Sequence, residues 1–328
     1  MSLINPITAG KRNVYLIDLG TGTNRNLLPL GLGFLSSYCN KFPEIQEQYN
    51  IELRFLRTGT KEMVDSFENP AVVGIACYMW NFNASMALAR LVKERFPNCL
   101  IVGGGYSMPN IPSRIEPFIN VHPYVDVMVH GEGEVVLSSL LLNILEKKDF
   151  STINGITLRQ LESADGYITT PSRVEGIELD DIPSPFLDGT FDKLIERHRD
   201  QITGMIWETS RDCPYSCTFC AWGKTDGKSI RKFNLDRLFA ELDWVSRNKI
   251  SYMASSDANF GIFYERDMQI ASKISQLHKD TGYPKHLTWS WAKNSNEKVM
   301  RIADVFREGG VNARVLISMQ SFNKNVGK

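Results

Sequence analysis

The sequence predicts an α/β protein with two domains joined by a connector. At 328 residues the chain is too long for one ordinary hydrophobic core, so two domains are expected. Short apolar runs alternate with amphipathic helical segments, and residues 72–78 are almost uniformly apolar, which is typical of a parallel strand buried on both faces. We therefore expect a doubly wound, Rossmann-like domain over residues 1–150, a connector over 151–200 and a second strand–helix series over 201–328.

Five apolar runs of the first domain are predicted to be strands, at residues 14–19, 51–56, 72–78, 99–102 and 125–129. Residues 31–40 and 83–96 carry helical apolar stripes, the second with Asn83 as its expected N-cap, and a further helix runs through Leu145. In a doubly wound sheet, ligands bind beyond the carboxyl ends of the strands.

Glycine-rich loops follow the fourth and fifth of these strands. The glycines are Gly103, Gly104 and Gly105 after the fourth strand, and Gly131 and Gly133, on either side of Glu132, after the fifth. Without a Cβ, these backbones can approach a large flat ligand closely, although tight turns alone would also explain them. A dinucleotide site is disfavoured, because Arg25 stands where the third glycine of a fingerprint starting at Gly20 would be.

The connector contains a hairpin over residues 153–170, with Asp165 and Gly166 at its turn, and an extended linker over 180–189 that holds two prolines. The second series then provides strands at 202–209, 251–255, 286–292 and 313–319, and helices at 235–247, 266–281 and 296–307. Polar residues follow each strand, which is where βα folds place their active sites.

Three cysteines follow the first strand of the second series. Cys213, Cys217 and Cys220 are spaced C-x3-C-x2-C, so three thiolates can converge on one metal centre from a single loop. A cubane iron–sulfur cluster takes four ligands, and three cysteines leave one iron open. A structural zinc site would need a fourth ligand, and the nearest downstream histidine is His278. A disulfide with one spare thiol stays a further alternative.

With Phe219 directly before its last cysteine, this motif resembles the signature of radical S-adenosylmethionine (SAM) enzymes. In that family the open iron of a [4Fe–4S] cluster chelates SAM, which is reductively cleaved to a 5′-deoxyadenosyl radical. The resemblance implies that residues 201–328 form the first four βα units of a partial, TIM-like radical SAM barrel. It also implies SAM contacts at Phe219, Asp257, Asn259, Ser290, Ser318 and Gln320; turn or capping roles are the alternative for Asp257 and Asn259.

The first domain resembles the cobalamin-binding domain that precedes this barrel in a large radical SAM subfamily. The resemblance lies in residues 29–32, 103–107 and 125–134. The Asp-x-His-x-x-Gly motif of other cobalamin proteins is absent, so no histidine lower ligand is expected. Tyr78 and Trp80 are candidates for the lower face of the corrin, with an ordinary core position an equal alternative for Trp80. The implied cobalamin contacts are Tyr78, Trp80, Gly103, Gly104, Gly105, Gly131, Glu132 and Gly133.

These resemblances imply a cobalamin-dependent radical SAM methyltransferase that acts on an unactivated carbon or a phosphinate phosphorus of a small-molecule or natural-product substrate. A flavodoxin- or ferredoxin-type reductant is the implied partner. Radical rearrangement, cyclisation or ring contraction, a radical SAM enzyme without cobalamin, and a non-enzymatic iron–sulfur or zinc module stay open. The chain ends just after its fourth expected barrel strand, so we expect a C-terminally truncated sequence.

Composition excludes other classes. Lys plus Arg and Asp plus Glu both number 37, so the net charge of zero gives no reason to expect nucleic-acid binding. The longest apolar runs fall far short of the ~18 residues that a membrane span requires, and residues 1–13 lack the apolar core of a signal peptide. A cytoplasmic protein is expected, with Cys39, Cys77 and Cys99 as small buried hydrophobes.

Metal analysis of the anaerobically purified chain tests the interpretation of the cysteine loop. We expect iron and acid-labile sulfide, because three thiolates in one loop suit a cluster with an open iron. Zinc without sulfide would contradict the radical SAM interpretation and leave a zinc module.

Overall fold

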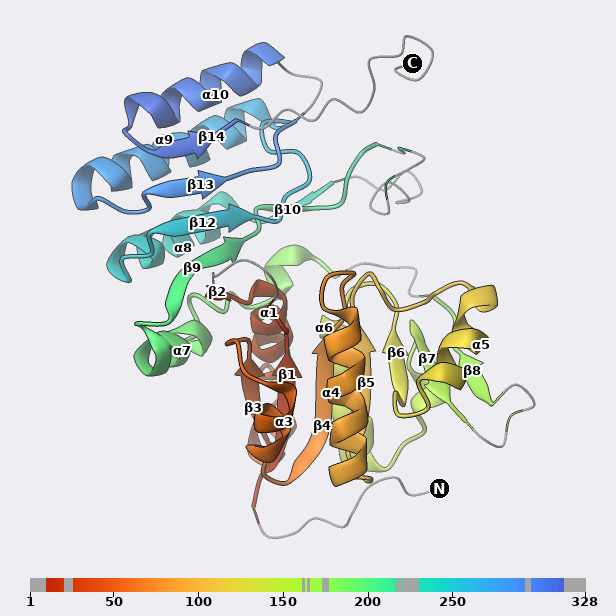
Figure 1. Cartoon of the computed structure of the whole chain (residues 1–328). Coiled ribbons are helices and arrows are strands. Elements are labelled where there is room, and N and C mark those ends of the chain that lie inside the picture. Colours follow the sequence, from red (N-terminus) through yellow and green to blue (C-terminus); the bar gives the residue numbers. More distant parts are fainter. Residues whose placement is uncertain are drawn as a thin grey trace. The chain divides into compact units, whose positions relative to one another are not determined.

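The structure is a computed structural model that describes residues 10–20, 26–160, 163, 166–172, 177–215, 217, 220, 230–292 and 296–315 (Figure 1). The chain divides into two compact units. The first comprises Met1–Ile177 and Asp181–Arg197, and the second comprises Glu178–Asp180 and His198–Lys328. Among the described residues, none of the helices is both long enough and apolar enough to cross a membrane.

A seven-stranded sheet forms the centre of the first unit, in the order β3-β1-β4-β5-β6-β7-β8. Its strands are β1 (Arg12–Ile17), β3 (Tyr49–Arg54), β4 (Pro70–Ala76), β5 (Leu100–Gly104), β6 (Val127–Val129), β7 (Ile156–Arg159) and β8 (Tyr167–Thr169). The strands from β3 to β6 pair in parallel, and β7 and β8 pair antiparallel. Along the chain the parallel strands therefore take the flavodoxin-like order 2-1-3-4-5, in which the strand order reverses between β1 and β4.

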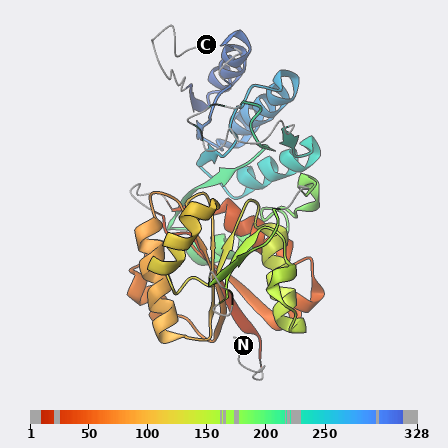
Figure 2. The same ribbon diagram turned by 90° about the vertical axis from the view of Figure 1, so that its right-hand side faces the viewer.

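Helices cover both faces of this sheet (Figure 2). They are α1 (Leu30–Cys39), α2 (Pro43–Gln48), α3 (Thr60–Asp65), α4 (Phe82–Arg95), α5 (Pro112–Val121) and α6 (Glu134–Glu146), and a short strand, β2 (Asn26–Leu28), precedes α1. Helix α1 packs against α6, and α3 packs against α4. The central strands are fully covered, as the uniformly apolar sequence of β4 predicts: Val72, Val73 and Ile101 are buried completely.

The start of α4 differs from the prediction. We expected Asn83 as the N-cap, whereas the helix begins at Phe82 with Asn81 in the cap position. The Asn81 side chain does not bond to the helix; its Oδ1 accepts from the backbone N–H of Tyr78 at 2.7 Å, and its Nδ2 donates to the carbonyl of Ala76 at 3.0 Å. Asn81 thus shapes the loop after β4 instead of capping the helix.

The hairpin expected over residues 153–170 forms from β7 and β8, but it is part of the first sheet. Ile156 is fully buried, and β7 pairs with β6 along its length. The segment after the hairpin also packs on the first unit, because Phe191 of α7 (Thr190–His198) lies so close to Gly33 that a Cβ there would be 2.5 Å from its ring. Most of residues 151–200, for which we expected a connector, therefore belong to the first unit.

The second unit contains four parallel strands in the order β14-β13-β12-β9. Its elements are β9 (Ile202–Trp207), β10 (Ser210–Arg211), β11 (Arg231–Lys232), α8 (Leu235–Arg247), β12 (Tyr252–Ser255), α9 (Tyr264–Thr281), β13 (His286–Thr288), α10 (Asn296–Glu308) and β14 (Asn312–Arg314). The predicted strand–helix alternation is confirmed in this part of the chain. One strand is shorter than expected, because β13 ends at Thr288. Residues 316–319 of the last expected strand lie outside the described residues.

Gly105, directly after β5, allows a test of the backbone conformation of the loop that follows this strand. Its φ of +96° is in the left-handed region, and a Cβ would lie 2.6 Å from the carbonyl oxygen of Cys77. We expect Gly105→Ala to lower the free energy of unfolding by about 2–3 kcal/mol. Gly104→Ala is the matched control, because a Cβ there meets nothing within 4 Å, and we expect a change of about 0.5 kcal/mol or less. Urea unfolding measures both; equal stability of the two variants would contradict the assigned backbone.

Candidate functional site

The three cysteines of the motif differ from the other three in exposure. Cys213, Cys217 and Cys220 are partly exposed, whereas Cys39, Cys77 and Cys99 are buried. Burial raises the pKa of Cys77 and of Cys99 to about 12, which keeps both protonated. Because metals bind thiolates, the partly exposed set is the one suited to a metal. The expectation that the other three are small buried hydrophobes is confirmed.

The cysteine loop is only partly within the described residues. The backbone N–H of Cys220 donates to the carbonyl of Cys217 at 3.0 Å, so these two residues share a tight turn. Phe219 and residues 221–229 lie outside the described part of the chain. Among the described residues, no three His, Cys, Asp or Glu side chains are grouped as a metal site. Three free thiols in one short loop fit an iron–sulfur cluster by residue type, and their convergence stays a prediction.

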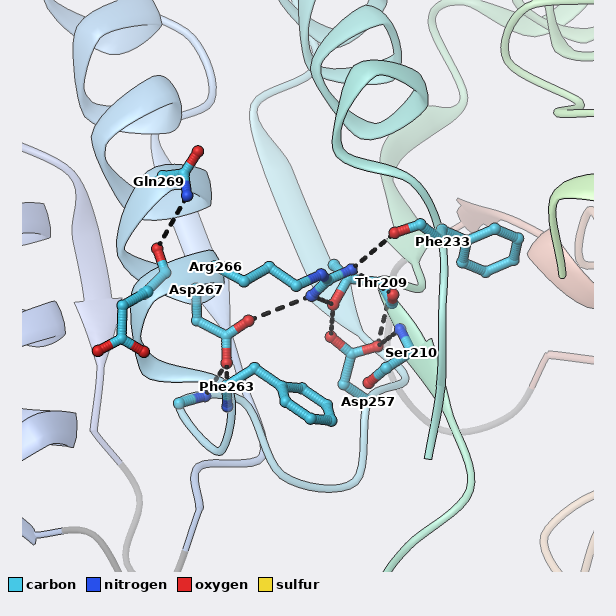
Figure 3. A network of polar contacts seen from close by, with 10 residues as sticks. Thr209, Ser210, Phe233, Asp257, Phe263, Arg266, Asp267 and Gln269 are labelled. Atoms are coloured by element: carbon cyan, nitrogen blue, oxygen red, sulfur yellow. Dashed lines mark hydrogen bonds and ion pairs between the residues drawn. The ribbon is translucent and has the colours of Figure 1, made fainter. Parts of the chain in front are cut away.

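A buried carboxylate lies at the base of this loop (Figure 3). Asp257, in the loop after β12, is 1% exposed. It accepts hydrogen bonds from the backbone N–H of Thr209 at 2.7 Å, from the Thr209 hydroxyl at 2.7 Å and from the backbone N–H of Ser210 at 3.0 Å. Thr209 and Ser210 connect β9 to the cysteine motif, so Asp257 fixes the point from which the cysteine loop starts.

Arg266, near the start of α9, completes this network (Figure 3). Its guanidinium donates to the carbonyl of Thr209 at 2.7 Å, to the carbonyl of Phe233 at 3.2 Å and to the Thr209 hydroxyl at 3.2 Å. It also forms an ion pair with Asp267 at 3.2 Å. Since Thr209 precedes the cysteine loop and Phe233 follows it, one cation binds both ends of the loop.

Both carboxylates of the network have altered acidity. Desolvation raises the pKa of Asp257 despite its hydrogen bonds and the nearby Arg266. Desolvation also raises the pKa of Asp267 to about 6, opposed by Arg266 and by the backbone N–H groups of Gly261 and Phe263, which donate to its Oδ2. Asp257, the expected SAM contact, is buried, and its carboxylate faces the backbone N–H groups of Thr209 and Ser210.

The other expected SAM contacts fall in three places. Asn259 is 6% exposed and its Nδ2 donates to the Sγ of Cys213 at 3.2 Å, so the structure brings it to the cysteine loop. Ser290 is exposed, and its carbonyl accepts from the backbone N–H of Phe260 at 2.8 Å. Ser318 and Gln320 lie outside the described residues.

In the first unit, exposed apolar side chains follow β4 and β5. Met79 is 86% exposed, Trp80 60% and Tyr106 67%, and the rings of Tyr78 and Trp80 stack with centroids 4.8 Å apart. The alternative of an ordinary core position for Trp80 is therefore wrong. Aromatic surface of this kind at the carboxyl ends of parallel strands is suited to a flat ligand.

The glycines of the first unit divide by what a side chain would meet. At Gly103 a Cβ would lie 2.6 Å from Met108 Sδ, and at Gly133 it would lie 3.0 Å from Leu35 Cδ2, so the neighbouring side chain occupies the space at both positions. Gly104 and Gly131 are open, with nothing within 4 Å of a Cβ. Only this second pair leaves space that a ligand could use. Glu132 lies between Gly131 and Gly133 in the second of these loops.

The sequence did not single out Asp18, which is the first residue after β1. Asn81 Nδ2 donates to its Oδ1 at 3.3 Å, so the loops after β1 and β4 are joined at the point where the strand order reverses. Burial raises the pKa of Asp18 to about 6. The available signal was a lone carboxylate at the end of an otherwise apolar strand sequence, VYLID.

Comparison with known proteins gives a family context for these two units. No family model matches the chain. The chain is 37% identical, over 96% of its length, to the cobalamin-dependent radical SAM methyltransferase TokK of Streptomyces tokunonensis. A second relative, the 2-(S-pantetheinyl)-carbapenam-3-carboxylate methyltransferase of Streptantibioticus cattleyicolor, is 37% identical over 98% of the chain.

The matches cover 45% and 46% of these two relatives, so the chain spans about half the length of the curated relatives it matches. Among solved structures, the radical enzyme OxsB with aqua-cobalamin and SAM bound aligns over 93% of this chain and 49% of that one, with a TM-score of 0.62 and 20% identity. The methyltransferase TsrM of Kitasatospora setae, with cobalamin and a [4Fe–4S] cluster bound, aligns over 93% and 66%, with a TM-score of 0.59 and 16% identity. The likeness to both is one of fold.

The raised pKa of Asp18 predicts a pH-dependent stability. The folded-state pKa exceeds the unfolded value of 3.8, so the contribution of Asp18 to stability is highest below pH 4 and is lost as the pH rises through about 6. We expect Asp18→Asn to stabilise the chain at pH 7.5 by up to about 2 kcal/mol, and by less at pH 5. Urea unfolding at both pH values tests this, with Asp200→Asn, an exposed carboxylate, as the control. A gain that is equal at the two pH values would contradict the assignment.

Proposed function

We propose that this chain is the cofactor-binding part of a cobalamin-dependent radical SAM methyltransferase. The observation that carries the proposal is a C-x3-C-x2-C loop of free, partly exposed cysteines after the first strand of a parallel βα unit. The 37% identity to TokK along nearly the whole chain supports it. The activity, the substrate and the partners of the whole protein are part of the proposal.

In this proposal Cys213, Cys217 and Cys220 hold a [4Fe–4S] cluster and leave one iron for SAM. When bound, such a cluster supplies the electron for reductive cleavage of SAM. The contribution of the protein is to position three thiolates, through the turn at Cys217 and Cys220 and through the fixed base of the loop at Thr209. Phe219, Ser290, Ser318 and Gln320 remain candidates for SAM contacts.

Cobalamin would bind the first unit at the carboxyl ends of its parallel strands, where it supplies the methyl group for transfer. The half-buried ring of Tyr78 stacks on the exposed ring of Trp80, and a Cβ at Gly104 or Gly131 would meet nothing within 4 Å. A histidine lower ligand is not expected: His122 Nδ1 is hydrogen bonded to the hydroxyl of Tyr124 at 2.6 Å, and His130 Nε2 to that of Thr157 at 2.8 Å. Residues 1–150, extended by the hairpin of β7 and β8, form this proposed cobalamin-binding domain, and residues 201–328 the first part of the radical SAM barrel.

The proposed substrate is a small molecule or natural product. The relative from S. cattleyicolor is named for a carbapenam carboxylate, which supports that class. A flavodoxin- or ferredoxin-type protein would supply electrons. Six free cysteines suit the reducing cytoplasm, which we propose as the location.

Substitution of one cluster ligand tests the proposal. After anaerobic reconstitution with iron and sulfide, the chain should cleave SAM to 5′-deoxyadenosine when a chemical reductant is added. Cys217→Ala should reduce this cleavage by about a hundredfold or more, because the cluster loses one of its three ligands. Chromatography of 5′-deoxyadenosine measures cleavage, and Cys99→Ala, which alters a buried cysteine, is the control.

The same samples test the second cofactor. Both variants should co-elute with hydroxocobalamin in gel filtration, because the cobalamin contacts lie in the first unit. Cleavage that survives in Cys217→Ala would show that the ligands are assigned wrongly. Failure of the wild type to bind cobalamin would withdraw the methyltransferase proposal and leave a radical SAM enzyme. When a substrate is added, a product with the same mass as that substrate would favour rearrangement over methyl transfer.

A further inference from the structure

We propose that the loop after β12 is a clamp on the cysteine loop, in which Asp257 and Asn259 are positioning residues and not contacts of SAM. The inference rests on the proposed function, because it concerns the same cysteines. It assigns to these two side chains a role in placing the thiolates and in setting the reduction potential of the cluster they would hold.

The clamp holds the cysteine loop first at its stem. Strands β10 and β11 pair antiparallel, Ser210 with Lys232 and Arg211 with Arg231, so the residues before and after the loop lie side by side. The backbone N–H of Phe233 donates to the carbonyl of Thr209 at 3.1 Å, which extends this pairing. Asp257 then binds the entering strand through two backbone N–H groups and the Thr209 hydroxyl. The stem therefore has one fixed position relative to the loop after β12.

Arg266 connects the clamp to both ends of the stem. It donates to the carbonyls of Thr209 and Phe233 and to the same Thr209 hydroxyl that donates to Asp257. The Thr209 hydroxyl thus forms hydrogen bonds to a buried anion, Asp257, and to a partly buried cation, Arg266. Charge-assisted hydrogen bonds of this kind are stronger than neutral ones, and a partner removed from them leaves a buried charge unsatisfied.

The second point of the clamp is a sulfur atom of the motif. Asn259 Nδ2 donates to Cys213 Sγ at 3.2 Å. The backbone next to Asn259 is itself fixed: Phe260 forms a bridge with Trp291, and Asp267 accepts from the backbone N–H of Gly261. The amide is therefore held against Cys213 from a rigid segment.

An N–H donor to a cluster sulfur has a defined electrostatic effect. Reduction adds negative charge to a cluster, and a hydrogen bond to a ligating sulfur stabilises that charge, which raises the reduction potential. Asn259 would therefore make the cluster easier to reduce, while Asp257 and Arg266 set where Cys213 lies. A contact of SAM would instead change the binding of SAM and leave the potential of the SAM-free cluster unaltered.

The sulfur contact is tested with Asn259→Leu, which removes the donor without adding charge. We expect iron and sulfide content to stay at the wild-type level and the midpoint potential, from a redox titration followed by electron paramagnetic resonance without SAM, to become more negative. Gln269→Leu, which changes an exposed residue of α9, should leave the potential unchanged. A wild-type potential with weakened SAM binding in Asn259→Leu would overturn the proposal.

The stem is tested with Thr209→Val and Thr209→Ser, of which only the second keeps the bridging hydroxyl. In the metal-free chain we expect Thr209→Val to speed tryptic cleavage at Arg211 and Arg231 several-fold, with no change in Thr209→Ser. After reconstitution, Thr209→Val should hold several-fold less iron and sulfide. Equal cleavage and equal iron in both variants would overturn the clamp. If the wild type takes up no cluster, but Thr209→Val is still cleaved faster than Thr209→Ser, the proposed function is overturned and the clamp is retained.

Discussion

The hydrogen bonds to the buried carboxylate of Asp257 are the interactions on which the second unit depends. It receives two backbone N–H groups and a hydroxyl from the two residues that leave β9, and Arg266 lies on the other side of that hydroxyl. Burial of an anion and a cation is costly unless every group is paired, and here each has several partners. As a result, the segment after β9, the residue after β11, the loop after β12 and the start of α9 share one polar network (Figure 3).

In the first unit, whose central strands are also parallel, the polar contact of interest joins two loops at the carboxyl ends of the strands. Its loops after β1 and β4 are joined by Asp18 and Asn81, which replaces a helix cap by a link between two strand ends. The neighbouring side chains, Trp80 and Tyr106, are left exposed. A rigid backbone that carries exposed aromatic rings can receive a flat ligand with little loss of conformational entropy.

The sequence was sufficient for the order of strands and helices and for the cysteine motif, because apolar runs and residue spacing are local. Residues 72–78 and 202–209 fall on β4 and β9 within a few positions. Long-range pairings were not predictable: nothing local in residues 153–170 says that β7 joins β6. Side chains with several possible partners were also ambiguous. The resemblance to radical SAM enzymes implied a SAM contact for Asp257, whereas its burial against Thr209 depends on β9 and β12 being neighbours. Asn81 and Asn83 are equally good caps by residue type, and only the fold selects between them.

The two edge strands of the seven-stranded sheet carry features that oppose strand pairing with another chain. An unpaired strand edge is a template for another chain, and natural sheets protect it with short strands or with charge. The hairpin provides the first protection, because β8 at one margin has only three residues. The other margin, β3, carries Glu52 and Arg54, which form an ion pair at 3.1 Å. A second copy that pairs with β3 would have to desolvate this ion pair. A second copy that pairs with β8 would find few backbone groups to bond. The hairpin therefore also protects the first unit against self-association.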